Sequence, residues 1–191
     1  MRKITFDIET KNFFSETGSN DPASLDIAVV CIHDSTTDKY SSYFEEELSK
    51  LWPILEKTDL LIGFNSDHFD IPLLDKYYSG DLTKIKSLDL LKEVKKSLGR
   101  RIKLDTLAEA TLGRNKTADG LSASRWWKEG KKEQVRDYCI EDVRITKDIY
   151  DYALANGHLK YKDGKDIKEI KIDTSFWESA PTSAMTHTLP F

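Results

Sequence analysis

The sequence has 191 residues, of which 39% are hydrophobic and 32% are charged, and its formal net charge is −4 at pH 7. This length suits a single domain with a filled core, and the apolar content is too high for a disordered chain. We find no apolar run near the ~20 residues of a membrane helix and no signal-peptide pattern, so we expect a cytoplasmic protein without a membrane partner. The slight acidity excludes coating of nucleic acid by global charge but allows a local basic groove.

The first half of the chain alternates between strand and helix patterns. Strands are expected at residues 2–7, Ile27–Ile32, Tyr40–Phe44 and Asp59–Phe64. The second of these is almost continuously apolar, as a strand buried on both faces would be. Helical spacing is found at residues 45–55, where Pro53 bends the helix or marks its start, and again at 69–78. This alternation predicts an α/β protein.

The second half is expected to be mostly helical. Helices are predicted at Leu90–Leu98, Leu104–Leu112 and Lys132–Ala155, and each is followed by a glycine suited to a helix C-terminus. Residues 159–172 resemble a hairpin that turns at 162–165. We therefore expect one domain over residues 1–157, a hairpin extension of it over 158–177, and a flexible tail over 178–191. The two cysteines, Cys31 and Cys139, lie in apolar patterns and are expected to be buried free thiols.

Residues 81–104 form the one strongly basic stretch. It holds eight basic residues against three acids: Lys84, Lys86, Lys92, Lys95, Lys96, Arg100, Arg101 and Lys103 against Asp81, Asp89 and Glu93. Such a stretch either follows a phosphate backbone or is a solvated helix face.

The first pattern with chemical meaning is Asp7-x-Glu9. A strand has a period of two, so both carboxylates project from the same face. Together they can bind a hard divalent cation, although ordinary surface acids show the same pattern.

The second pattern is Asn65-x-x-x-Phe69-Asp70, which follows the fourth predicted strand. It places Asp70 near the carboxyl edge of the sheet, where open α/β sheets bind ligands. The alternative is a turn and helix cap with Phe69 in the core.

The third pattern is Tyr138-x-x-x-Asp142 in the long helix. A spacing of four residues puts the phenol and the carboxylate on one helix face. They border an apolar stripe that would dock the helix on the sheet, formed by Val135, Cys139, Val143 and Tyr150. The alternative is a half-buried tyrosine beside a solvated acid.

In this order and context, the three patterns resemble the sequence motifs of the DEDDy 3′ to 5′ exonucleases, which are DnaQ-like. The spacing of the second is most similar to the proofreading domains of family B DNA polymerases and their stand-alone relatives. The resemblance runs from about Ile4 to Ala155 and includes residues 104–113. It implies a ribonuclease H-like fold, with a mixed central sheet flanked by helices and extended here by the C-terminal hairpin.

The resemblance also implies the roles of the residues. Asp7, Glu9 and Asp142 would hold an ion that activates water, and Asp70 would support a second, both ions being Mg²⁺ or Mn²⁺. Tyr138 would orient the attacking water. Thr10, Asn65 and Phe69 would contact the substrate, which would be the 3′ end of single-stranded DNA or RNA.

Hydrolysis of a phosphodiester agrees with these residue types, because two metal ions held by carboxylates can stabilise the charge that develops. We therefore expect a single-domain exonuclease that releases nucleoside monophosphates. Two alternatives share the fold: a non-catalytic nucleic-acid-binding module and an RNase H-type endonuclease. The retained acids argue against the first, and Tyr138 against the second. The sequence identifies no protein partner and does not choose between DNA and RNA.

Overall fold

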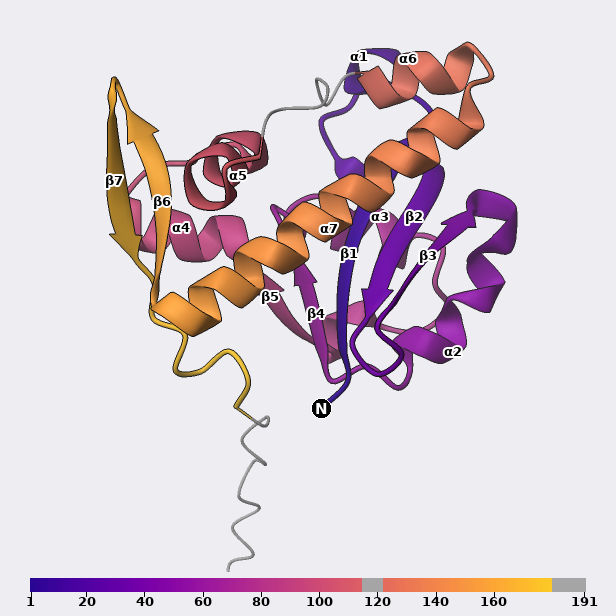
Figure 1. Ribbon diagram of the computed structural model, residues 1–191. Coiled ribbons are helices and arrows are strands. Elements are labelled where there is room, and N and C mark those ends of the chain that lie inside the picture. Colours follow the sequence, from indigo (N-terminus) through magenta and orange to yellow (C-terminus); the bar gives the residue numbers. More distant parts are fainter. Residues whose placement is uncertain (115–121, 180–191) are drawn as a thin grey trace, which may run out of the picture.

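The computed structural model describes residues 1–114 and 122–179. Its centre is a five-stranded sheet with the strand order β3-β2-β1-β4-β5 (Figure 1). The strands are β1 (Lys3–Thr10), β2 (Ile27–Asp34), β3 (Lys39–Phe44), β4 (Leu60–Gly63) and β5 (Lys86–Asp89). Strands β1, β2 and β3 pair antiparallel, whereas β1, β4 and β5 pair parallel. The predicted mixed α/β sheet is thus confirmed.

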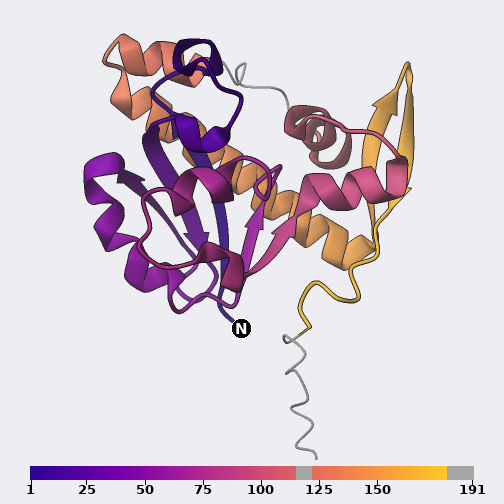
Figure 2. The same ribbon diagram turned by 180° about the vertical axis from the view of Figure 1, so that it is seen from behind.

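Helices cover both faces of this sheet. The long helix α7 (Lys132–Asn156) crosses one face in front of the strands in Figure 1. The short helices α2 (Trp52–Leu55) and α3 (Asp70–Asp75) lie on the other face, which Figure 2 shows from behind. The remaining helices are α1 (Phe14–Thr17), α4 (Leu90–Leu98), α5 (Leu104–Leu112) and α6 (Ser122–Lys128), with 3₁₀ turns at Pro22–Ser24, Glu45–Lys50 and Leu82–Lys84.

Strand β1 divides its side chains between the two faces. Ile4, Phe6 and Ile8 are buried in the core that includes helices α2 and α3. The intervening residues Asp7 and Glu9 must therefore project toward α7, because successive strand side chains alternate. This helix docks on the sheet through the predicted apolar stripe, whose members Val135, Cys139 and Val143 are fully buried.

Three expected elements differ from the predictions, and three observed elements were not predicted. Strand β1 continues to Thr10, so Glu9 lies within it. The helix expected at 45–55 is divided into a 3₁₀ turn and α2, and Pro53 lies in the first turn of α2, which is one of the two alternatives stated for this proline. The helix expected at 69–78 is regular only over α3. Strand β5 and helices α1 and α6 were not predicted.

The predicted hairpin is present as β6 (His158–Asp163) and β7 (Asp166–Lys171), which form a separate two-stranded sheet. It packs on α5, where the Thr111 hydroxyl donates to the Lys160 carbonyl and accepts from the Lys160 N–H. Two residues expected in the flexible tail are held: Glu178 accepts from Lys3 and Tyr150, and the Ser179 carbonyl accepts from Lys86. The rest of that tail, 180–191, lies outside the described residues.

Both cysteines are buried and free, as predicted, and they meet between β2 and α7. The Cys139 thiol donates to the Asp7 carbonyl at 3.4 Å. Within the described parts of the chain, no helix is both long and apolar enough to cross a membrane.

Candidate active site

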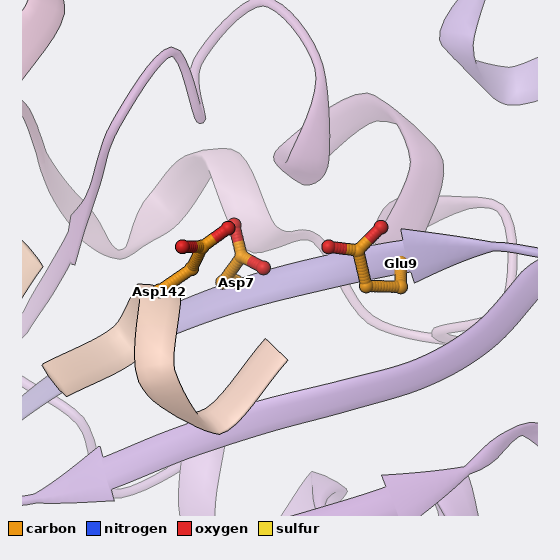
Figure 3. Close-up of side chains that lie close together, drawn as sticks. All are labelled: Asp7, Glu9 and Asp142. Atoms are coloured by element: carbon orange, nitrogen blue, oxygen red, sulfur yellow. The ribbon is translucent and has the colours of Figure 1, made fainter. Parts of the chain in front are cut away.

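Strand β1 and helix α7 bring three carboxylates together. Asp7 and Glu9 project from β1, and Asp142 projects from α7 toward them (Figure 3). Each residue offers one oxygen, and these three oxygens lie within 4.8 Å of one another. Asp7 and Asp142 are 135 positions apart in the sequence, so only the docking of α7 on β1 creates this cluster, which we call the acidic cluster.

Asp70 joins the acidic cluster from the opposite side of β1. Strands β1 and β4 pair in parallel as far as Thr5 and Ile62, and their pairing ends there. Asp70 is the first residue of α3 and is almost fully buried. Its charge acts on the Asp7 carboxylate, so Asp70 lies near the acidic cluster but outside the tightest group of three.

Burial and mutual repulsion raise the pKa values of these acids. Burial is the larger cause for Asp7, whose pKa rises to about 8 with a further contribution from Asp70. The pKa of Asp142 also rises to about 8, through burial and then the charge of Asp7. Burial raises the pKa of Asp70 to about 7. The pKa of Glu9 is well above its ordinary range for the same two reasons. Positive charge placed among them would reverse these shifts.

The donor set fits a divalent metal ion. One oxygen of Asp7, Oδ2, is buried and has no hydrogen-bond partner in the structure. A buried, unpartnered carboxylate oxygen is costly unless it is protonated or bound to a cation. Mg²⁺ and Mn²⁺ prefer oxygen ligands, and carboxylates are what the acidic cluster offers. A metal ion bound here would therefore be a partner for Oδ2 of Asp7, which has no hydrogen-bond partner in the protein.

Tyr138 lies one turn before Asp142 on α7 and faces the same cluster. Burial first, and then the charges of Asp142 and Glu9, raise the pKa of Tyr138 far above its ordinary value. The phenol therefore remains protonated and acts as a hydrogen-bond donor. Its ring packs edge-on against Trp126 of α6, with the centroids 5.8 Å apart.

A cavity of about 560 Å³ opens beside Glu9. Thr10 and Phe69, two predicted substrate contacts, line it with Glu9. Most of its wall is apolar, and the Phe14 and Phe69 rings meet edge to face at 6.1 Å. The Ser124 hydroxyl of α6 donates to the Thr10 carbonyl at 3.0 Å and closes one side.

Asn65, the third predicted contact, does not line this cavity. It has a left-handed backbone with φ +66°, and its side-chain oxygen accepts from Arg101 at 2.7 Å. Asn65 and Arg101 instead line a second hollow with Lys103. The positive φ turns the side chain away from Phe69, although both belong to one sequence pattern.

The basic stretch is not one continuous surface. Lys92 pairs with Asp67, and Arg100 lies over the Tyr161 ring at 5.4 Å. Two members, Lys92 and Arg101, reach the loop of the second sequence pattern, through Asp67 and Asn65 respectively. The residues of this stretch therefore split between ion pairs, ring contacts and solvent.

Sequence reasoning missed several residues around the site. Phe13, Phe14 and Ser124 line the cavity, and Trp126 supports Tyr138. Asp105 on α5 adds negative charge near Tyr138 and Asp142. The adjacent aromatic residues 13 and 14, directly after the first pattern, were a usable signal for the cavity. Nothing local in residues 122–128 indicates that α6 reaches β1.

Comparisons with known proteins agree with this architecture. No curated protein matches the chain. Among solved structures, the family B DNA polymerase from the hyperthermophilic archaeon Pyrobaculum calidifontis is similar, with a TM-score of 0.62 and 19% sequence identity. The similarity covers 81% of this chain but only 24% of the polymerase chain, so it concerns the fold of one part of that protein.

The RNase_H superfamily model matches residues 4–154. This range contains β2 to β5, all but the first residue of β1, all but the last two residues of α7, and every member of the acidic cluster. Nucleases of this superfamily use divalent metal ions, for which the acidic cluster has suitable ligands. The chain belongs to the RNase_H superfamily.

Proposed function

We propose that the protein is a 3′ to 5′ exonuclease that removes nucleoside monophosphates from single-stranded nucleic acid, with two Mg²⁺ or Mn²⁺ ions as cofactors. The observation that carries the proposal is the acidic cluster, with its oxygens within 4.8 Å, beside a cavity that Glu9 shares with Phe69. The cluster supplies ligands for metal ions, and the cavity supplies room for one nucleotide at the reacting bond.

Asp7, Glu9 and Asp142 would hold one ion, and Asp7 with Asp70 would serve the second. When bound, the ions stabilise negative charge at the phosphorus centre and lower the pKa of a water molecule. The unpartnered Oδ2 of Asp7 supports its place between the two sites. Asp70 suits this role, because it is almost fully buried and its charge acts on Asp7.

Tyr138 would position the attacking water. A phenol whose pKa is raised by burial and by neighbouring carboxylates donates a hydrogen bond and does not act as the base. Its edge contact with Trp126 limits where the hydroxyl can go. A fixed donor near the reacting phosphate lowers the barrier by orientation.

The cavity would take the 3′-terminal nucleotide. Its volume of about 560 Å³ falls within the range of ligand pockets, ~300–1,000 Å³. The rings of Phe14 and Phe69 offer apolar surface for a base, and stacking on aromatic side chains is tolerant of sequence. Thr10, at the edge of this cavity, would contact the sugar, while Asn65 and Arg101 would contact the strand further from the end.

A time course with end-labelled oligonucleotides tests the proposal. Single-stranded DNA and RNA, each labelled at the 3′ or the 5′ end, are incubated with Mg²⁺, Mn²⁺ or EDTA. The 3′ label should be released at once as a mononucleotide, the 5′ label should yield a shrinking ladder, and EDTA should stop both. Internal fragments from both labels would identify an endonuclease instead. Binding without any product, in either metal, would identify a non-catalytic module.

A further inference from the structure

Asp89, at the carboxyl end of β5, is almost fully buried and bonds to two separate segments. As the N-cap of α4, it accepts from the N–H groups of Leu91 at 2.9 Å and Lys92 at 3.4 Å. It also accepts from the N–H groups of Asn65 at 2.8 Å and Asp67 at 3.3 Å. Both of the latter belong to the loop that joins β4 to α3, residues 64–69, which we call the β4–α3 loop.

The β4–α3 loop ends at two residues of the site that come from neither β1 nor α7. Phe69 at its end lines the cavity, and Asp70 follows directly as the first residue of α3. The loop has an unusual backbone, since Asn65 has a positive φ of 66°. A non-glycine residue in this conformation costs free energy and persists where surrounding contacts enforce it. The bond from the Asn65 N–H to Asp89 is such a contact.

Two further side-chain bonds connect β5 and α4 to the β4–α3 loop. The Ser87 hydroxyl donates to the Asp67 carboxylate, and the Lys92 ammonium pairs with that same carboxylate. Within the loop, the Phe69 N–H donates to the Asn65 carbonyl at 3.1 Å. The position of Asn65 therefore determines the position of Phe69, the residue directly before α3. The bonds from β5 and α4 to the β4–α3 loop therefore also fix the positions of Phe69 and Asp70.

We propose that Asp89 is a positioning residue for the active site: its carboxylate fixes the β4–α3 loop so that Phe69 and Asp70 are held against β1. The role in catalysis rests on the proposed nuclease function, whereas the fixing of the loop does not. Asp89 lines neither the cavity nor the acidic cluster, so it positions Phe69 and Asp70 through the loop backbone, and its charge also acts on Asp70.

The two sets of bonds can be separated by substitution. Asparagine caps helices about as well as aspartate, so Asp89→Asn can retain the cap of α4. In the structure Oδ1 accepts from Asn65, Leu91 and Lys92, whereas Oδ2 accepts from Asp67 alone. The single amide oxygen of Asp89→Asn can therefore keep both the cap and the Asn65 bond, and only the Asp67 N–H loses its partner. Asp89→Ser keeps a capping oxygen but is too short to reach the loop, so it separates the cap from the loop bonds.

The test measures hydrogen exchange and kinetics on the full chain. In Asp89→Ser we expect the amides of the β4–α3 loop to exchange about 10-fold faster, while α4 keeps its protection, and in Asp89→Asn we expect faster exchange at Asp67. On a single-stranded oligonucleotide, kcat of Asp89→Ser should fall about 10-fold and KM should change less, because Asp70 acts at the reacting phosphate. Val94→Ala is the matched control, since it weakens α4 from the core at a fully buried position and leaves the Asp89 carboxylate in place. It should lower stability and leave loop exchange and kcat unchanged.

Wild-type loop exchange and kcat in Asp89→Ser would overturn the proposal and reduce Asp89 to a helix cap. If that variant does not fold, Asp89→Asn decides the question, and wild-type exchange at Asp67 in it would overturn the proposal. A wild-type protein without nuclease activity would refute the proposed function, yet loop exchange in the variants would still decide whether Asp89 fixes the loop.

Discussion

The carboxylate of Asp7 lies in surroundings that disfavour its charged form, because one of its oxygens is buried without a hydrogen-bond partner and its neighbours are acids. We expect Asp7→Asn to lower kcat about 100-fold or more, since a positioned catalytic group contributes at least that factor. The same change should raise the melting temperature in EDTA at pH 8, because one repelling charge is removed. Steady-state kinetics and thermal unfolding check the two expectations.

Asp137→Asn is the control for Asp7→Asn, because Asp137 is an exposed acid that pairs with Arg136 on α7, at the turn that carries Tyr138. It should leave both measurements near the wild-type values. Wild-type kcat in Asp7→Asn would remove the acidic cluster from the mechanism.

Tyr138 is expected to act in the transition state rather than in binding. Tyr138→Phe keeps the ring that packs on Trp126 and removes only the hydroxyl, so we expect kcat to fall about 10-fold or more with little change in KM. Tyr152→Phe, on the same helix but next to His158, should behave as wild type. A rise in KM at constant kcat would show instead that Tyr138 contributes to substrate binding.

At the scale of single elements, the β4–α3 loop depends on a glycine at the end of β4. A Cβ added to Gly63 would lie 2.4 Å from the Cβ of Ser66, which is fully buried. We expect Gly63→Ala to displace the loop, to cost about 1–3 kcal/mol of stability, as overpacking does, and to lower kcat/KM. Denaturant unfolding and kinetics measure both.

Gly157→Ala provides the comparison for Gly63→Ala. Gly157 ends α7 with φ +67°, so alanine there costs about 1 kcal/mol by backbone strain, far from the site. The stability loss should occur without a loss in kcat/KM. Equal effects of the two variants on kcat/KM would show that the β4–α3 loop has no special role.

The sequence predicted the elements that have a strong local signal. Strand β2 is apolar over Ile27–Ile32, and α7 has regular helical spacing and a glycine stop, so both were correct to within a few residues. Strand β5 has four residues in a basic stretch, and its position is decided by pairing with β4. Helix α6 has seven residues and is held by tertiary contacts such as Ser124 with Thr10. Short elements of this kind carry little periodic signal.

Part of the site could be predicted in the same way. Motif spacing indicated that Asp7, Glu9 and Asp142 lie together, because strand and helix periods fix which face a residue occupies, and the structure brings their oxygens within 4.8 Å. It did not indicate that Asn65 lies outside the cavity that Phe69 lines, and no spacing indicates its positive φ. It also passed over Asp89, whose four N–H partners come from two segments that only the folded chain brings together.

For the whole molecule, the acidic cluster predicts how stability depends on pH without metal. The folded pKa values of Asp7 and Asp142 are about 8 and that of Asp70 is about 7, whereas an unfolded chain has values near ~4. Between about pH 4 and pH 8, the folded state thus binds more protons than the unfolded state. Stability in EDTA should fall as the pH rises through this window, and Mg²⁺ should restore it at the upper end.

Urea unfolding at several pH values, with EDTA or Mg²⁺, checks this dependence. Asp7→Asn should reduce the slope, because it removes one of the titrating groups. A slope that is the same in EDTA and in Mg²⁺ would mean that the cluster does not bind the ion.

The central claim is that the protein degrades a strand from a free 3′ end. The acidic cluster would bind the metal ions, and the neighbouring cavity would hold the terminal nucleotide. The most direct measurement mixes linear and circular single-stranded DNA of one sequence with the wild-type protein or Asp142→Asn, in Mg²⁺. The account predicts that the wild-type protein degrades the linear strand to mononucleotides and spares the circle, and that Asp142→Asn degrades neither. Loss of the circle at the rate of the linear strand, or equal degradation by the two proteins, would contradict it.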